Sequence, residues 1–460
     1  MKLHAAPLGL LLPLFLTAVC CTATGQGKGI HPNATTTTVT ATANTVRHVT
    51  RRLLAADASP QISWNRNLCT SVSFVERVLA LRRGPKRRVL VTGAGGFIGS
   101  HVAEFLSEIL GWETIAVDDL SGGFKRNIPK NATFVNVDLK RPQAVAHLFD
   151  NHGPFDYVYH LAAYAAEGLS HFIRRFNYRN NLEASVSIIN QCVVHKVKTI
   201  VFTSSIAAYG APTVKPFIEE LPQHPEDPYG ISKHAVELDL KAAHEMFGLN
   251  FVVFRPHNVY GPRQNIADKF RNAIGIFMNQ IMHDEPMTIF GDGKQTRGFS
   301  YIDDVSPFIA VSPEVPEALQ QGFFVGSDTA YSVNDLANAV AKAMGVPSNL
   351  KHLEARNEVA DAYASHEKLR CFFNPPPPVA LEVGLARTAQ YAKSIGKFEP
   401  TGFTDIEVWD KMPPSWVVAL KKWEAEAPAK LTKPHTGHAH ARRGVGGLGG
   451  GGAGGRIPTD

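Results

Sequence analysis

TGAGGFIG, residues 92–99, directly follows the apolar run Val89–Val91 and opens an amphipathic segment that extends to Leu110. It carries three glycines at intervals of three residues: Gly93, Gly96 and Gly99. In a strand–turn–helix unit the first glycine allows a tight turn, the second lets the backbone approach a pyrophosphate, and the third lets helix and strand pack closely. A glycine triplet alone is weak evidence. Later motifs along the chain agree with it, so we predict a dinucleotide-binding turn here.

Strand and helix patterns alternate along the middle of the chain. Apolar runs typical of strands fall at residues 89–91, 114–117, 133–137, 157–161, 199–203 and 251–254. Helical patterns separate several of them, at 97–110, 143–150, 177–195 and 229–247. Such alternation predicts an α/β protein with a Rossmann-like, doubly wound parallel sheet. We assign the dinucleotide-binding domain to residues 85–256, with later segments returning to it, and a smaller, mainly substrate-binding C-terminal lobe to residues 257–422.

Composition places the chain among globular proteins. The 460 residues are 44% hydrophobic and 19% charged, which allows one large domain or two smaller ones. The net charge of +6 is modest, and much of it lies in clusters outside the expected core, including residues 82–88. Clusters of this kind usually mark solvated linkers or tails, so we expect no nucleic-acid partner.

The two ends differ in composition from the middle. Residues 1–27 contain the apolar run Leu8–Cys21, which is typical of a signal peptide or signal anchor. Residues 28–84 are predicted to form a disordered stem or linker, with a candidate glycosylation acceptor at Asn33. We therefore expect the lumen of the Golgi or endoplasmic reticulum, with membrane contact only through an N-terminal anchor. The scarcity of acidic residues before Asp57 also suits an organelle transit peptide, which stays open as an alternative.

The C-terminal residues 423–460 are predicted to be a disordered tail rich in glycine and histidine. The five cysteines do not suggest a disulfide framework, because Cys20 and Cys21 fall in the leader and an odd number remains. Those three, Cys69, Cys192 and Cys371, have no metal-ligand spacing, so no metal site is expected. Cys192 falls in a predicted helix, and we interpret it as a buried thiol.

A carboxylate follows the second predicted strand. Asp118 comes about twenty residues after the glycines, where such a group accepts hydrogen bonds from the adenine ribose hydroxyls. It would repel a 2′-phosphate, so the sequence favours NAD over NADP.

The segment Tyr229-Gly-Ile-Ser-Lys233 places a phenol and an ammonium four residues apart on a predicted helix, and therefore on one face. An ammonium beside the phenol, with the positive nicotinamide nearby, would lower the tyrosine pKa and make it usable as a base. Ser205 ends another predicted strand, where its hydroxyl can reach the same substrate oxygen.

Taken together, TGAGGFIG, VDDLSGG, HLAA, TSSIAAYG, YGISK, RPHNVYGPRQ and GDGKQTRGFSYIDDV resemble the extended short-chain dehydrogenase/reductase family. Within it, the match is to the NAD-dependent nucleotide-sugar epimerases and dehydratases, and nearest to the UDP-glucose 4-epimerase branch. The resemblance covers about residues 86–395.

The resemblance implies roles for individual residues. It assigns catalysis to Ser205, Tyr229 and Lys233. It assigns contacts with NAD to Tyr229, Lys233 and the following residues: Gly93, Gly96, Phe97, Ile98, Gly99, Asp118, Asp138, Leu139, Leu161, Ala162, Ala163 and Asn180. It assigns contacts with the substrate to Ser205, Asn258, Arg297 and Arg356. It also implies a homodimer joined through two helices per subunit, those that follow HLAA and contain Tyr229.

The implied activity is epimerisation of a nucleotide sugar, a UDP-sugar, of the UDP-glucose/UDP-galactose 4-epimerase type. Hydride passes transiently to bound NAD, and a 4-keto sugar forms and is reduced on its other face. The alternatives are a dehydratase or reductase on the same fold and a non-catalytic NAD-binding protein. Dehydratases of the family carry an Asp-Glu pair after the catalytic hydroxyl residue, whereas this chain has Ile206-Ala207, which favours epimerisation.

Three positions depart from the family pattern and leave the sugar open. The usual Arg-Asp-Phe reads Arg297-Gly298-Phe299, and the usual Arg-x-Gly-Asp is replaced by Arg356-Asn-Glu358. Glu167 stands where relatives often have an apolar residue, and an acid facing the sugar would disfavour a uronic acid.

Overall fold

The computed structural model describes residues 64–355, 359, 361–398, 403 and 406–431. The expected leader at residues 1–27, the stem up to residue 63, Asn33, Arg356 and the tail beyond residue 431 lie outside the described residues.

A seven-stranded parallel sheet forms the centre of the described protein, in the order β11-β6-β5-β4-β1-β2-β3. The chain winds outward from β1 through β2 and β3 on one side and through β4, β5 and β6 on the other, as in a doubly wound sheet. The bounds are β1 Arg88–Thr92, β2 Glu113–Asp118, β3 Thr133–Asn136, β4 Tyr157–His160, β5 Thr199–Thr203, β6 Asn250–Pro256 and β11 Gln321–Val325. The predicted Rossmann-like fold is confirmed.

Both faces of the sheet are buried, and alternate residues of each strand enter different cores. On β1, Val89 and Val91 belong to one cluster of buried side chains, whereas Leu90 belongs to the other. This period of two is the geometry of a strand, and continuous apolar runs suit strands that are covered on both faces.

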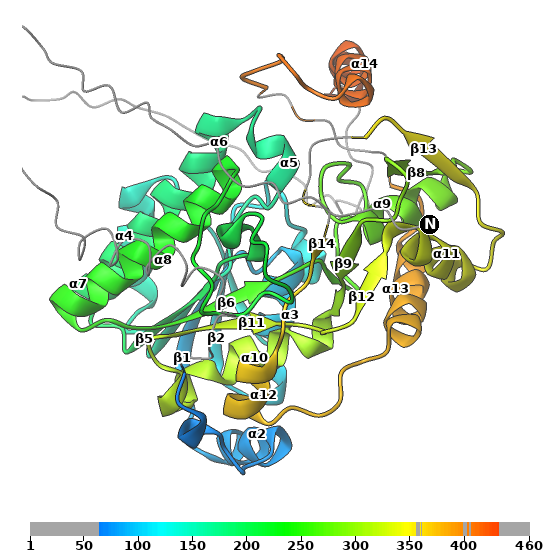
Figure 1. Ribbon diagram of the computed structural model, residues 1–460. Coiled ribbons are helices and arrows are strands. Elements are labelled where there is room, and N and C mark those ends of the chain that lie inside the picture. The colour runs from blue at the N-terminus through cyan, green and yellow to red at the C-terminus, as the bar shows by residue number, and fades with distance from the viewer. Residues whose placement is uncertain (1–63, 356–358, 360, 399–402, 404–405, 432–460) are drawn as a thin grey trace, which may run out of the picture. The chain divides into compact units, whose positions relative to one another are not determined.

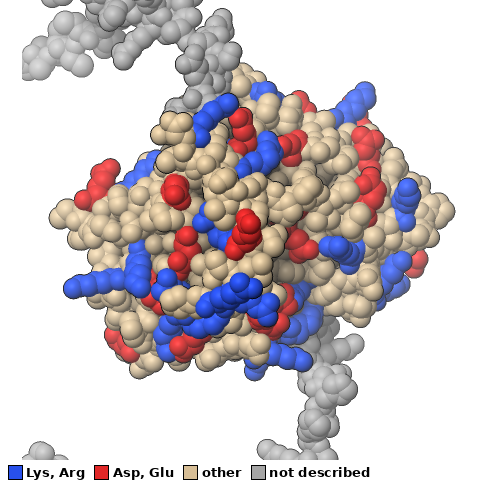
Figure 2. All heavy atoms as spheres, turned by 90° about the horizontal axis from the view of Figure 1, so that it is seen from below, with Lys and Arg blue, Asp and Glu red and all other residues tan. Residues whose placement is uncertain are grey.

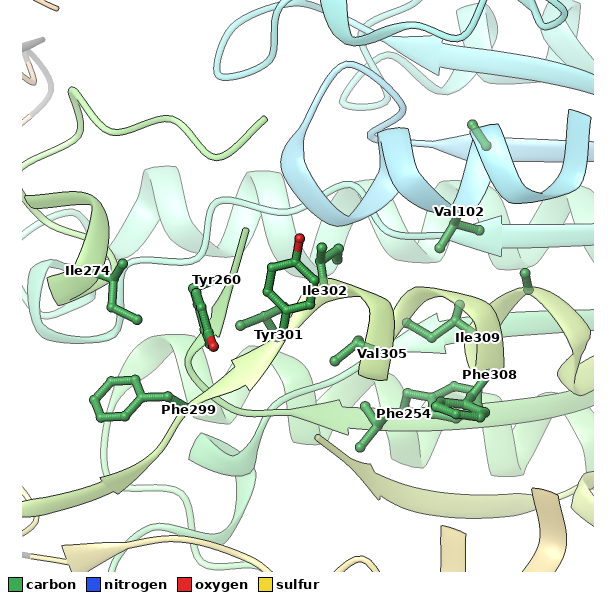
Figure 3. Close-up of a cluster of buried hydrophobic side chains, with 14 of the residues drawn as sticks. Val102, Phe254, Tyr260, Ile274, Phe299, Tyr301, Ile302, Val305, Phe308 and Ile309 are labelled. Carbon is green, nitrogen blue, oxygen red and sulfur yellow. The ribbon is translucent and has the colours of Figure 1, made fainter. Parts of the chain in front are cut away.

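Helices cover the two faces. On one face lie α4, α7 and α8, which Figure 1 shows side by side. On the other face lie α3 and α10, and Figure 3 shows Val102 of α3 near Phe308 and Ile309 of α10 and Phe254 of β6. The bounds are α3 Phe97–Glu104, α4 Pro142–His152, α7 Ala184–Val194, α8 Pro228–Phe247 and α10 Ser306–Val311.

Helix α8, which carries Tyr229 and Lys233, has clear end signals. The Asp227 side chain accepts a hydrogen bond from the Gly230 amide at 2.9 Å, and Pro228 occupies the first turn. Gly248 ends the helix in the left-handed region, at φ 73°.

The smaller lobe consists of short sheets and helices that follow β6. Its sheets pair β7 with β10, β8 with β13, and β9 with both β12 and β14. The bounds are β7 Val259–Tyr260, β8 Met287–Phe290, β9 Thr296–Gly298, β10 Ser300–Tyr301, β12 Ala330–Ser332, β13 Leu350–Leu353, β14 Asp361–Ala362, α9 Ala273–Met282, α11 Val333–Met344, α12 Glu367–Phe373 and α13 Leu381–Ile395. As predicted, later segments return to the sheet, since β11 pairs with β6.

The prediction of a disordered stem is wrong for residues 64–84. Residues Phe74–Arg83 form helix α2, which begins with a capping box between Ser73 and Glu76. Phe74 is buried against Phe308, with ring centroids 4.6 Å apart. This apolar contact, with a residue far along the chain, orders the segment.

The sequence predicts no disulfide framework, but one disulfide does form, because Cys69 is bonded to Cys371 across a separation of 302 residues. The bond joins the segment before α2 to α12. Counting cysteines could not reveal it, because the pairing depends on the tertiary fold. Cys192 is free and buried, as predicted.

The predicted start of the tail at residue 423 is wrong as well, because helix α14 runs from Pro414 to Leu431. Its residue Trp416 is buried between Phe270 and Phe172, at ring-centroid distances of 5.1 Å and 6.4 Å. Upstream, the Glu407 carboxylate accepts hydrogen bonds from two backbone amides of α6, Arg174–Tyr178, both at 2.9 Å. These contacts dock the segment on the NAD-binding domain.

Figure 2 shows acidic and basic side chains interspersed over one face of the molecule. The basic cluster at residues 82–88 is not a solvated linker throughout, since Arg87 pairs with Glu314 at 2.6 Å and Arg88 with Glu113 at 2.5 Å. Among the described residues, no helix combines the length and apolar character needed to cross a bilayer.

Candidate active site

The glycine turn opens one end of a large cavity at the carboxyl edge of the sheet, with a volume of about 2590 Å³. Gly93 has φ +71°, and a Cβ added there would lie 2.8 Å from Ala162 backbone atoms. A Cβ on Gly99 would lie 2.1 Å from the Gly93 carbonyl oxygen. Only glycine fits at either position. The first turn of α3 has no side-chain cap at Gly96, so its amides are available to an anionic pyrophosphate.

Asp118 ends β2 and lines the same cavity. Its carboxylate accepts hydrogen bonds from the Gly95 amide at 2.9 Å and the Leu120 amide at 2.7 Å. Burial raises the Asp118 pKa, and these amides oppose the rise. Each oxygen retains a lone pair, so the carboxylate can also accept ribose hydroxyls. The turn and this carboxylate therefore fit NAD.

The other predicted cofactor contacts mostly line the cavity. These are Phe97, Ile98, Leu139, Leu161, Ala162, Ala163 and Asn180. Asp138 is not among the lining residues, and its carboxylate pairs with Lys140 at 2.8 Å. Lys140 also donates to the Asn180 amide oxygen at 3.1 Å and lines the cavity, although sequence reasoning missed it.

Ser205, Tyr229 and Lys233 meet at this edge and line the cavity. The Ser205 side chain acts on the Tyr229 hydroxyl so as to lower its pKa. Lys233 is buried and donates from Nζ to the Thr203 carbonyl oxygen at 2.8 Å, with Nζ 5.8 Å from the centre of the Tyr229 ring. Burial lowers the Lys233 pKa to about 7.

The sequence predicts a lowered phenol pKa, but in the protein alone burial raises the pKa of Tyr229. The Ser205 side chain opposes this rise, and the negative charge of Glu167 adds to it. Lys233 does not reverse the effect, because its ammonium is turned toward Thr203 and is itself poorly solvated. A lowered pKa would need the additional positive charge of a bound nicotinamide.

An ion pair that sequence reasoning missed lies behind Lys233. Glu237, one turn further along α8, raises the Lys233 pKa. It accepts two hydrogen bonds from Arg255, at 3.0 Å from Nε and 2.6 Å from Nη2, and both side chains are buried. The i+4 spacing from Lys233 to Glu237 is the signal that could have indicated it.

On the substrate side, Asn258 and Arg297 line the cavity, whereas Arg356 lies outside the described residues. Asn258 has φ 40°, and its side chain donates to the Gly298 carbonyl oxygen at 3.1 Å. Arg297 donates from Nη1 to the Thr296 carbonyl at 2.9 Å and from Nη2 to the Val359 carbonyl at 2.5 Å. Glu167 begins helix α5, Glu167–Ser170, and also lines the cavity.

Several lining residues lie outside every motif identified in the sequence. Arg271 stacks 4.8 Å above the centre of the Tyr164 ring and pairs with Asp268 at 2.8 Å. The segment around α14 contributes lining residues including Phe403, Met412, Trp416 and Trp423. A signal in the sequence was the set of three tryptophans, Trp409, Trp416 and Trp423, spaced seven residues apart.

Comparisons with known proteins agree with this geometry. The family model described as "NAD dependent epimerase/dehydratase family" matches residues 89–323. The UDP-glucose 4-epimerase of Mycolicibacterium smegmatis is 30% identical over 315 residues, which is 67% of this chain and 99% of that protein.

Solved structures show the same relationship. The UDP-glucose 4-epimerase of Thermotoga maritima with UDP-glucose has a TM-score of 0.64 at 32% identity, covering 67% of this chain and 99% of its own. The UDP-glucuronic acid 4-epimerase of Bacillus cereus, in complex with UDP-glucuronic acid and NAD, has a TM-score of 0.61 at 26% identity, covering 67% and 99%. The chain therefore belongs to the NAD-dependent epimerase/dehydratase family, whose cofactor is NAD.

Proposed function

We propose that this protein is an NAD-dependent epimerase that inverts C4 of a UDP-sugar. The observation that carries the proposal is that Ser205, Tyr229 and Lys233 line the same cavity as the glycine turn and Asp118, with Lys233 Nζ 5.8 Å from the centre of the Tyr229 ring. The relatives, which are 4-epimerases of UDP-glucose and UDP-glucuronate, support the reaction class.

The chain's own residues have separable tasks in this proposal. Bound NAD supplies reversible hydride acceptance from the sugar carbon. Tyr229 takes the proton of the reacting hydroxyl and returns it to the other epimer, and Ser205 holds that oxygen by a hydrogen bond. Lys233 adds positive charge near the phenol, and its own protonation is supported by Glu237. The amides of α3 and the Asp118 carboxylate hold the cofactor.

We further propose a neutral sugar, of the UDP-glucose and UDP-galactose type. Glu167 lines the cavity and is close enough to Tyr229 to raise its pKa by charge. A second carboxylate on the sugar would be repelled there. Exchange of Glu167 for Gln is expected to improve turnover of UDP-glucuronate relative to UDP-glucose, and an unchanged ratio would contradict the assignment.

The dehydratase and binding-only alternatives are less well supported. Ile206–Tyr209 forms a short 3₁₀ turn directly after Ser205, and it contains no acid to assist elimination of water. A protein that only binds NAD has no need of the Ser205–Tyr229–Lys233 arrangement.

The test uses the purified full chain with UDP-glucose, UDP-galactose, UDP-xylose and UDP-glucuronate, with and without added NAD, and resolves products by chromatography. Formation of a C4 epimer without net NADH, abolished by Tyr229→Phe, supports the proposal. Net NADH or a dehydrated sugar would indicate the dehydratase or reductase alternative, and inert bound NAD the binding-only alternative.

We also propose that the protein resides in the lumen of the secretory pathway. The Cys69–Cys371 bond supports this, because stable disulfides form in oxidising compartments. Peptide mapping without reductant and a glycosylation test at Asn33 check it. Free thiols at both cysteines, with an unmodified Asn33, would favour an organelle instead.

A homodimer is proposed from the exposed apolar side chains of the helices beside the catalytic tyrosine. Leu238, Met246 and Phe247 of α8 are 50%, 76% and 63% exposed, and Val194 at the end of α7 is 67% exposed. Light scattering on the purified protein gives the mass, and a monomer at micromolar concentration would contradict the proposal.

A further inference from the structure

A chain of hydrogen bonds begins at the cavity wall on the substrate side, where His257 is a lining residue, and runs into the protein. The Asp328 Oδ1 atom lies 2.6 Å from His366 Nδ1, and His366 Nε2 lies 3.0 Å from His257 Nε2. His257 Nδ1 lies 3.1 Å from the Gly298 carbonyl oxygen. His257 follows β6, His366 precedes α12, and Gly298 ends β9, so the chain connects three elements that are distant in sequence.

The geometry fixes how many protons this chain carries. Its two ends, a carboxylate and a carbonyl, only accept hydrogen bonds. Three contacts therefore need three protons, but two neutral imidazoles hold only two. With two protons on the ring nitrogens, one of the three contacts would bring two lone pairs together without a proton between them. With four protons, the N–H groups of His366 Nε2 and His257 Nε2 would point at each other and repel. Three protons satisfy every contact, so the fully hydrogen-bonded form of the histidine pair holds one positive charge, balanced by Asp328.

The surroundings oppose positive charge on the pair, so the third proton is held only at acidic pH. Both imidazoles are buried, at 2% and 1% exposure, and burial lowers the pKa of each. Asp328 opposes that effect at His366 and also binds Arg370. The charged groups that act on the pair are therefore Asp328, from the loop after β11, and Arg370, from α12. The ring nitrogens contact each other directly, which leaves no room for a metal ion between them.

The chain ends on the carbonyl that also anchors a predicted substrate residue. The Gly298 carbonyl oxygen accepts from both His257 and Asn258, each at 3.1 Å, and Arg297 is the preceding residue. Gly298 itself is required by this arrangement, because a Cβ there would lie 2.7 Å from His257 Cε1. The departure from the family's Arg-Asp-Phe pattern thus follows from the position of His257.

We propose that Asp328, His366 and His257 form a singly charged proton chain that positions Asn258 and Arg297, through the Gly298 carbonyl, for binding the diphosphate of the nucleotide sugar. The histidines are positioning residues, since neither is assigned a contact with reacting atoms. The inference rests on the proposed function for the identity of the ligand. It predicts that affinity, rather than turnover at saturation, depends on the third proton.

The test measures binding of UDP-glucose to the full-length protein with NAD by calorimetry across a range of pH, beside KM and kcat. UDP-glucose is the probe because its diphosphate diester does not titrate near neutral pH. In the wild type, affinity should fall as pH rises and the third proton is lost. His257→Phe should weaken binding about tenfold at low pH and remove this pH dependence, with kcat changing much less.

Two substitutions separate a proton chain from a purely structural contact. His366→Asn can still donate to Asp328 but cannot reach His257, so it should resemble His257→Phe. Asp328→Asn can still accept from His366 but lacks the balancing charge, so the midpoint of the affinity profile should move to lower pH. His147→Gln, at an exposed position of α4, is the matched control and should bind as the wild type does.

Wild-type behaviour of His366→Asn, or an unmoved midpoint in Asp328→Asn, would overturn the inference. Thermal melting of each variant identifies any that does not fold, and the isosteric substitution Asp328→Asn then decides the outcome together with His366→Asn. Binding of UDP-glucose without epimerisation would refute the proposed function while leaving the positioning chain in place. No binding of UDP-glucose by the folded wild type would overturn both.

Discussion

Replacing Cys69 and Cys371 by alanine removes the disulfide that links the segment before α2 to α12. The other contacts of this segment are modest. Backbone hydrogen bonds join Thr70 to Cys371 at 2.9 Å and Phe74 to Asn374 at 3.1 Å. The ion pair between Arg66 and Glu367 is 63% and 46% exposed, so it contributes little.

The magnitude follows from the size of the closed loop. A separation of 302 residues gives a loss of unfolded-state entropy worth about 6 kcal/mol at 25 °C in the chain-entropy model. Measured values are usually smaller, because the unfolded chain retains structure, so we expect the double variant to lose about 2 to 5 kcal/mol of unfolding free energy. The helices of the catalytic domain do not depend on the link, and activity at low temperature should persist.

The assay compares urea unfolding with and without reductant. The wild type should lose stability on reduction, whereas the double variant should be insensitive to reductant. Cys192→Ala is the matched control, because it removes a buried free thiol and should stay as sensitive to reductant as the wild type. If reductant leaves wild-type stability unchanged, or non-reducing peptide mapping finds no Cys69–Cys371 peptide pair, the argument fails.

Three further predictions concern charges in and near the site. Asp118→Asn should weaken NAD binding about tenfold, because a neutral amide binds ribose hydroxyls less strongly than a carboxylate does. It should also narrow the preference for NAD over NADP, because the amide does not repel a 2′-phosphate. Fluorescence titration with each cofactor measures both effects. Glu237→Gln should move the alkaline loss of activity to lower pH, because Glu237 raises the Lys233 pKa; an unmoved pH profile in a folded variant would contradict that role. Glu219 is largely buried, which raises its pKa from 4.5 to about 7, so the folded state favours its protonated form and loses stability as pH rises through this range. Glu219→Gln removes that penalty and should gain up to about 3 kcal/mol over the wild type between pH 5 and pH 8, measured by urea unfolding at both pH values.

The fold and the cofactor half of the site are encoded locally, which is why the sequence predicts them. Strand β1, the glycine turn and α3 are contiguous, and each glycine is required by contacts within a few residues or with the adjacent strand. The alternation of Val89, Leu90 and Val91 between two cores follows from the pleat of a strand covered on both faces. Residues 64–84 and α14 were missed because their order comes from distant partners, such as Phe308 and Phe270, which no local pattern indicates.

The substrate half of the site is assembled from segments far apart in sequence. The role of each of its residues can be recognised only from their contacts in the folded protein. In the sequence alone, Gly298 stands where the family pattern has an aspartate, and nothing nearby explains the difference. In the structure it is the residue that leaves space for His257, whose ring joins His366 and Asp328 from two later segments. Gly298 thus packs against a network of three residues, each of which is unremarkable in the sequence. In this chain the glycine turn and the Tyr-x-x-x-Lys motif can be recognised in the sequence, whereas the proposed hold on the nucleotide sugar depends on contacts between segments distant in sequence.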